Sequence, residues 1–130
     1  MSKDNDLRRI PPSPEPFVEG DKVAARRITA IEGRPAQGEL AVKALIAGEQ
    51  MLCMQVHRRK GLIDAQHEHD DHESICYLVS GRMRVVIDGR TFIAGPGDVW
   101  LHRPGVPHYH ETLEDSVQLE FKSPPRRTWD

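Results

Sequence analysis

Turn signals divide most of this chain into short segments. From about residue 40 onward, glycine-containing turns alternate with short apolar runs, several of which are rich in β-branched or aromatic residues. The runs span residues 40–46, 51–58, 74–79, 83–87, 91–93, 99–101 and 117–121. No stretch of about 11 residues carries a sustained helical stripe, so the runs indicate strands. Regular short strands with glycine-rich turns predict an all-β sandwich or barrel.

One turn in this series also predicts which strands pair. Asp88-Gly89 stands between the apolar segment VVI and the segment RTFI. Both residues tolerate a positive φ, which the favoured two-residue hairpin turns require. The dipeptide therefore predicts an antiparallel hairpin between the two segments.

The length and the composition predict a single domain with polar ends. A chain of 130 residues corresponds to about one domain. Residues 1–16 are polar and rich in proline, so we expect a flexible arm, although such an arm can become ordered against a partner subunit. We expect residues 17–40 to form an N-terminal segment, residues 41–123 to form the barrel and residues 124–130 to form a C-terminal tail.

The charge distribution and the cysteines exclude several classes of protein. The net charge is −2 and the Lys and Arg residues are scattered, which argues against a nucleic-acid partner. Cys53 and Cys76 lie in apolar runs, where a buried reduced thiol is usual, and they are too few for a disulfide framework. No apolar run is long enough for a bilayer, and the N-terminus does not resemble a secretory signal. We therefore expect a cytoplasmic protein without a membrane partner.

A cluster of histidines and acidic residues is the candidate functional site. The segment HEHDDHE begins at His67 and ends at Glu73. Alternate residues of a strand share one face, so His67 and His69 can present two imidazoles to one ion. Glu73 lies four residues beyond His69, and it would share their face in an unbroken strand or return to it after a turn. Imidazoles with one carboxylate suit Fe, Mn, Zn, Ni or Cu. The alternative is a polar surface loop whose histidines lie in solvent.

Two motifs with the order and spacing of a known family surround these histidines. The first motif runs Gly61-LIDAQ-His67-Glu68-His69-DDH-Glu73, followed by seven residues and Gly81. The second motif runs Gly97-DVWLH-Arg103-Pro104-Gly105-VP-His108-YHE-Thr112. On these motifs, residues 58–122 resemble the cupin superfamily. The resemblance implies a single-domain, RmlC-like jelly-roll barrel, also called a double-stranded β-helix.

The resemblance also implies a set of metal ligands inside the barrel. His67, His69, Glu73 and His108 occupy the positions of the family's ligands. Three imidazoles and one carboxylate would leave two open positions on a divalent transition metal (Fe, Mn, Zn, Ni or Cu). A small-molecule substrate or ligand would bind at those positions. No other cofactor is implied, and no catalytic side chain can be assigned from the sequence.

Three departures from the family pattern bear on this ligand set. Seven residues separate Glu73 from Gly81 where the family usually has six, so the commoner register puts Ser74 at the carboxylate position. A β-bulge would restore Glu73, whereas its absence would leave a site of three histidines. Arg103 replaces a Pro and Thr112 replaces an Asn in the second motif, and we expect both changes to affect only turns or packing.

The remaining histidines have less specific interpretations. His72 lies in the acidic turn, where we expect it to be solvated. His110 shares the face of His108 in a regular strand, so it lines the mouth of the cavity, donates a hydrogen bond behind the site, or lies on an exposed rim. His57 and His102 lie within strands, and we expect both to be structural.

The sequence leaves three functional classes open. The first is a metal-dependent enzyme acting on a small organic molecule, either an oxygenase or an isomerase or lyase that polarises a carbonyl. The second is a non-catalytic small-molecule-binding or sensing cupin, because a fold does not determine a function. The third is a metal-free barrel. We favour the enzyme, and we expect a homodimer in which residues 1–40 cross over to the partner.

Overall fold

The computed structural model describes residues 7–129 and is built almost entirely of strands. The strands are β1 (Arg26–Ile31), β2 (Arg34–Ala47), β3 (Leu52–Arg58), β4 (Glu73–Ile87), β5 (Arg90–Ala94), β6 (Val99–His102) and β7 (His108–Ser123). A short 3-10 turn, η2, spans Gly20–Lys22. The all-β prediction is confirmed. Within the described residues, no helix is long and apolar enough to cross a membrane.

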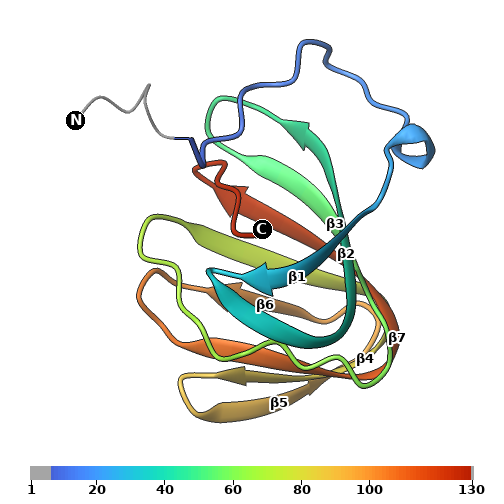
Figure 1. The fold of residues 1–130 in the computed structure, drawn as a ribbon, viewed down its shortest axis with the longest axis vertical. Helices are drawn as coiled ribbons and strands as arrows, with labels where there is room; N and C mark the ends of the chain where they lie inside the picture. Colours follow the sequence, from blue (N-terminus) through green and yellow to red (C-terminus); the bar gives the residue numbers. More distant parts are fainter. Residues whose placement is uncertain (1–6, 130) are drawn as a thin grey trace.

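The strands form one antiparallel sheet that curls into a barrel (Figure 1). The order is β1-β2-β3-β7-β4-β5, and β6 pairs with the first half of β4. The two longest strands, β4 and β7, pair from Glu73 opposite Ser123 to Ile87 opposite His108. This long ladder holds the end of the first motif and the start of the second on neighbouring strands.

The predicted hairpin joins β4 to β5. Ile87 pairs with Arg90, and the two turn residues Asp88 and Gly89 have φ values of 50° and 75°. A primed turn requires positive φ at both positions, which explains the choice of Asp and Gly. The hairpin prediction is confirmed.

A group of irregularities in the middle of β4 changes which residues face the interior. The register with β7 shifts between Leu78 and Met83. Before the shift the buried positions are even-numbered, as at Leu78, and after it the most deeply buried ones, Met83 and Val85, are odd-numbered. Gly81 lies within the irregular stretch with a φ of 95°, and a side chain there would collide with Ser116. Gly81 therefore permits the close approach of β4 and β7 that accompanies the shift.

The interior holds two apolar clusters and many buried polar side chains. One apolar cluster joins β2 and β3 with Leu62 and Trp129, and a smaller one lies around Leu78 and Met83. Many polar side chains are also buried: Arg58, Asp64, His67, His69, His72, Ser74, His102, His108, His110, Thr112, Ser116, Gln118, Glu120, Lys122 and Thr128. Burial of so many polar groups costs free energy unless each forms a hydrogen bond or ion pair, or binds a ligand. The polar interior therefore marks the functional part of the barrel.

The two ends of the described chain pack against each other. Arg9 forms a bridge with Arg126, and the Ile10 amide donates to the Pro125 carbonyl at 3.0 Å. Trp129 bridges to Ile31 at the end of β1 and is buried in the apolar core. Here β1 pairs with β2 of the same chain. The crossing of residues 1–40 to a partner remains a prediction.

Candidate metal centre

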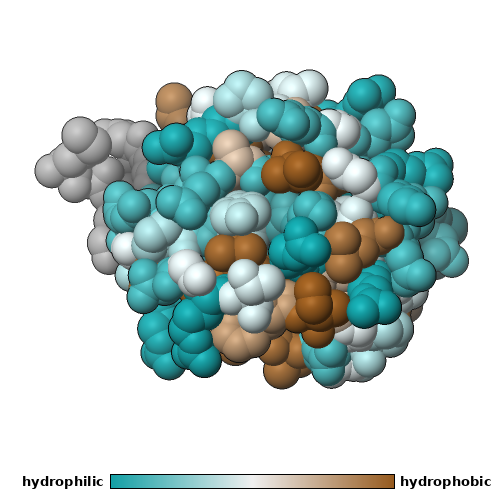
Figure 2. All heavy atoms as spheres, turned by 90° about the horizontal axis from the view of Figure 1, so that it is seen from below, coloured by the Kyte–Doolittle hydropathy of each residue, from teal (hydrophilic) through white to brown (hydrophobic). Residues whose placement is uncertain are grey.

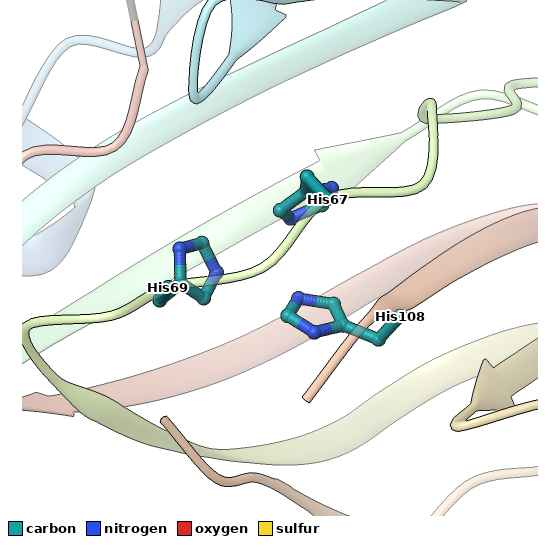
Figure 3. Close-up of side chains that lie close together, drawn as sticks. All are labelled: His67, His69 and His108. Atoms are coloured by element: carbon teal, nitrogen blue, oxygen red, sulfur yellow. The ribbon is translucent and has the colours of Figure 1, made fainter. Parts of the chain in front are cut away.

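Three histidines from two distant parts of the sequence converge inside the barrel (Figure 3). His67 and His69 lie on the segment that leads into β4, and His108 is the first residue of β7. The main chains of His67 and His108 exchange two hydrogen bonds of 3.0 and 2.9 Å. The three ring centroids lie between 4.4 and 5.0 Å apart. One nitrogen from each ring lies within 4.8 Å of the other two, a spacing at which one metal ion could bind all three.

Hydrogen bonds fix the orientation of two of these rings. His67 Nδ1 donates to the Ala65 carbonyl at 2.7 Å, and His108 Nδ1 donates to the Val106 carbonyl at 3.1 Å. A carbonyl only accepts, so the proton is on Nδ1 and the lone pair is on Nε2 in both rings. Backbone carbonyls orient metal-binding histidines in this way.

Ring nitrogens of two of the three histidines are buried without a hydrogen-bond partner among the described residues. His108 Nε2 and His69 Nδ1 are both in this state. An unpaired buried nitrogen is costly, because it has lost its bonds to water and gained none in the protein. A bound cation would compensate for this loss, so the donor set fits a metal ion.

The electrostatics of the cluster keep the imidazoles neutral. Burial, with a smaller contribution from His67, lowers the pKa of His108 to about 3. Burial also lowers the pKa of His67, and that of His69 falls further because His72 and Lys122 lie near it. A metal binds the neutral imidazole. The three rings are therefore in the protonation state that a metal requires at neutral pH.

Glu73, the predicted fourth ligand, does not join this cluster. It is the first residue of β4 and is exposed, whereas its neighbour Ser74 is buried and faces the interior. The irregularities of β4 begin only at Leu78, so no bulge turns the Glu73 carboxylate inward. The structure thus follows the register in which Ser74 takes the carboxylate position of the family. In this register only the three histidines of the predicted ligand set face the site, and the Glu73 carboxylate points away from it.

His72 lies inside the barrel, which corrects the expectation that it is solvated. Only 2% of the residue is exposed, and its ring centroid is 4.4 Å from that of His69. Its Nδ1 donates to the Asp71 carboxylate at 2.8 Å, which leaves Nε2 buried without a partner among the described residues. Sequence spacing could not place this ring, because the turn at Asp70 and Asp71 resets the strand alternation.

His102 forms one wall of the same cluster. Its ring stacks on that of His108, with centroids 3.6 Å apart and planes 8° from parallel. Its Nδ1 lies 3.4 Å from the Ser74 hydroxyl. This packing fixes the plane of His108, and the Nε2 of His102 is itself buried without a hydrogen-bond partner among the described residues.

His110 is buried behind the cluster and is not on an exposed rim. Its Nδ1 donates to Asp64 at 2.9 Å, and Trp100 Nε1 donates to its Nε2 at 3.3 Å. Both ring nitrogens are therefore occupied, and His110 offers none to a metal. Asp64 also pairs with Arg58 at 3.2 Å. Burial alone would raise the pKa of Asp64, but His110 and Arg58 outweigh it and hold that pKa well below its usual range.

Strand β7 adds charged side chains that the sequence analysis missed. Glu120 accepts a hydrogen bond from Gln118 at 3.1 Å and lies 3.6 Å from the Lys122 ammonium, which also donates to Thr128. Burial favours a neutral Glu120, but Lys122 and Arg58 outweigh it and lower the pKa of the carboxyl. The sequence could have predicted that these side chains face the interior, because they occupy the even-numbered positions of the strand that begins with His108.

A small cavity of about 30 Å³ lies among these groups. His67, His69 and His108 line it together with Glu120 and Lys122 from β7. Thr128 and Trp129 also line it, near the end of the described residues. A volume of this size holds about one water molecule or ion.

The fold and the motifs place this chain in the cupin family. Residues 54–122 match the cupin domain family. Over 85 residues, 65% of this chain and 77% of the relative, the sequence is 33% identical to "Pectin degradation protein KdgF" of Dickeya dadantii (strain 3937). The chain belongs to the cupin family, and the predicted jelly-roll barrel is confirmed.

Solved structures agree with this assignment at the level of the fold. KdgF from Halomonas sp. superposes with a TM-score of 0.75 at 22% identity, covering 85% of this chain and 95% of that one. An RmlC-like cupin from Shewanella frigidimarina NCIMB 400 superposes with a TM-score of 0.78 at 23% identity, covering 90% and 96%.

Proposed function

We propose that this cupin is a metal-dependent enzyme that acts on a small organic molecule. The observation that carries the proposal is the convergence of three buried, neutral imidazoles on one point. His67, His69 and His108 would hold a divalent transition metal (Fe, Mn, Zn, Ni or Cu), and the buried nitrogens of His69 and His108 that lack a hydrogen-bond partner support this assignment. Three protein ligands leave positions for a substrate or water.

The groups around the cluster suit carbonyl chemistry. A metal bound there would supply Lewis acidity, which polarises a substrate carbonyl. Glu120 is the group placed to accept a proton, since Lys122 and Arg58 keep its carboxylate ionised inside the cavity. We therefore favour an isomerase or lyase type of reaction over an oxygenase.

The charge balance of the cavity supports an anionic substrate. Arg58 and Lys122 balance Asp64 and Glu120, and the histidines are neutral. A divalent ion would leave two positive charges uncompensated, which a substrate carboxylate or enolate would offset. The similarity to a pectin degradation protein supports a small sugar acid with a carbonyl group as the substrate class.

Turnover assays test this proposal. Chelator-treated protein would be reloaded with each candidate divalent ion and assayed against a panel of keto and aldehydo sugar acids. We expect turnover with at least one ion, and a loss of at least about a hundredfold in Glu120→Gln with the metal retained. Dioxygen consumption without sugar-acid turnover would shift the assignment to an oxygenase. A ligand recovered unchanged from the metal-loaded protein, with no turnover, would favour the non-catalytic sensing cupin instead.

A further inference from the structure

His69 differs from the other two histidines of the cluster in what lies beside its Nδ1 atom. In His67 and His108 this atom donates to a backbone carbonyl, whereas in His69 it is buried without a hydrogen-bond partner among the described residues. Figure 3 shows one ring nitrogen of His69 turned toward the other two rings and the other turned away from them. The Nδ1 atom lies 3.8 Å from a carboxylate oxygen of Glu32. Orientation of the His69 ring therefore has a different source from that of its two neighbours.

Glu32 lies in the turn between β1 and β2, outside residues 54–122, which match the cupin domain. Ile31 pairs with Arg34, so Glu32 and Gly33 form a two-residue turn, with φ values of 50° and 75°. Such a turn favours Asn, Asp or Gly at its first position, and the longer side chain of glutamate strains the backbone there. Strained residues of this kind cluster at functional sites, so the glutamate at this position indicates a role for its side chain.

The Glu32 carboxylate is held inside the molecule rather than in solvent. Hydrophilic side chains cover much of the surface on the side where β5 lies (Figure 2), and carboxylates are usually exposed in this way. The Glu32 side chain, in contrast, is only 19% exposed. Arg8 donates to its Oε1 at 2.9 Å, and the Glu32 amide donates to the Thr128 carbonyl at 2.7 Å. These contacts hold the carboxylate beside His69.

We propose that Glu32 is a positioning residue of the metal centre, which orients His69 by accepting a hydrogen bond from its Nδ1. The inference rests on the proposed metal site. With Nε2 bound to the metal, the proton of His69 lies on Nδ1, and metal-binding histidines commonly donate this proton to a carboxylate. The cation thus compensates the buried Nδ1 indirectly, by making it a donor to Glu32. At 3.8 Å the two atoms are too far apart for a hydrogen bond, and a side-chain movement of about 1 Å would form one.

His72 is the other side chain that could accept this hydrogen bond, and the ring geometry argues against it. Its Nε2 is also buried without a hydrogen-bond partner among the described residues. The ring centroids of His69 and His72 are 4.4 Å apart, and the ring planes are 32° from parallel. An N–H bond lies in the plane of its ring, so a hydrogen bond between two imidazoles separates the centroids by roughly 5 Å or more. The two rings therefore pack against each other, and Glu32 is the better acceptor.

Metal affinity of the full chain tests the proposal. In Glu32→Asn the side chain is too short to reach His69, whereas Asn-Gly suits the turn. Competition with a chromophoric chelator should show a Zn²⁺ dissociation constant at least about tenfold above that of the wild type. The metal-free variant should melt close to the wild-type temperature, and the visible absorption of its Co²⁺ complex should shift. Glu32→Gln keeps the length and an accepting oxygen, so its affinity should lie between the two.

The matched control is Glu39→Gln. The Glu39 carboxylate also lies 3.8 Å from a side-chain nitrogen, that of Arg59, but at the exposed surface, so Zn²⁺ affinity should not change. Tight Zn²⁺ binding by the wild type and equally tight binding by Glu32→Asn would overturn this inference alone. So would equal losses of affinity in Glu32→Asn and Glu39→Gln. Wild-type protein that binds none of the candidate ions would overturn the inference together with the proposed function.

Discussion

At the scale of single residues, the candidate site depends on side chains that hold the histidines in place. His110 and Arg58 both bind the Asp64 carboxylate, which is 1% exposed, and the amide of His110 donates to the same carboxylate. Trp100 completes the arrangement by donating to the other nitrogen of His110. Asp64 is therefore a positioning residue, since it holds His110 and Arg58 in place and does not itself bind a ligand.

Removal of the Asp64 carboxylate should destabilise the fold strongly. Asp64→Ala leaves the Arg58 guanidinium buried without its countercharge and the Nδ1–H of His110 without its acceptor. Breaking a buried pair by removing one partner costs about 3–5 kcal/mol. Urea unfolding of metal-free protein measures this cost. Asp115→Ala is the matched control, because Asp115 pairs with Arg59 at the exposed surface and its loss should change stability little. Equal stabilities of the two variants would contradict the role given to Asp64.

At the scale of secondary-structure elements, the sequence predicted the strands well and the site partly. Apolar runs and turn residues identified the strands and the Asp88-Gly89 hairpin, because strand alternation and turn geometry are local. His67, His69 and His108 followed from the same alternation and from the family motifs. Glu73 and His72 could not be placed, because alternation does not carry across the turn that separates them from His69. Which residues of β4 face the interior depends on how β4 pairs with β7, and that pairing joins residues far apart in the sequence.

The register of β4 against β7 should depend on Gly81. Gly81→Ala would force a side chain into Ser116 at a positive φ, so we expect a loss of about 2 kcal/mol or more in the free energy of unfolding. Denaturant titration measures the loss. Gly48→Ala is the control, since a methyl group there meets no atom within 4 Å and should cost little. If Gly81→Ala were as stable as Gly48→Ala, the close approach of the two strands would not matter for the fold.

At the scale of the whole molecule, the buried histidines should make the metal-free protein sensitive to acid. Burial lowers the pKa of His67, His69 and His108, the last to about 3, whereas the unfolded chain binds these protons near pH 6.5. Below about pH 6.5 the unfolded state therefore holds more protons, and stability falls as the pH decreases. Each titrating histidine contributes up to about 1.4 kcal/mol per pH unit between its unfolded and folded pKa values.

Urea unfolding at intervals from pH 8 to pH 4 checks this pH dependence. The free energy of unfolding should change little above pH 7 and should decrease steeply from about pH 6.5 downward. The lowered pKa of Glu120 adds to the loss at the acidic end of the range. A free energy of unfolding that stayed constant between pH 7 and pH 5 would show that these histidines accept protons in the folded state.

The central claim is that three histidines, and not Glu73, hold a metal ion. Elemental analysis of the purified protein, together with the variants His108→Ala and Glu73→Ala, tests it most directly. We predict about one transition-metal ion per chain in the wild type, the same content in Glu73→Ala, and a loss of at least about tenfold in His108→Ala. Wild-type protein that binds no stoichiometric metal after incubation with any of the candidate ions, or metal lost from Glu73→Ala as from His108→Ala, would contradict the account.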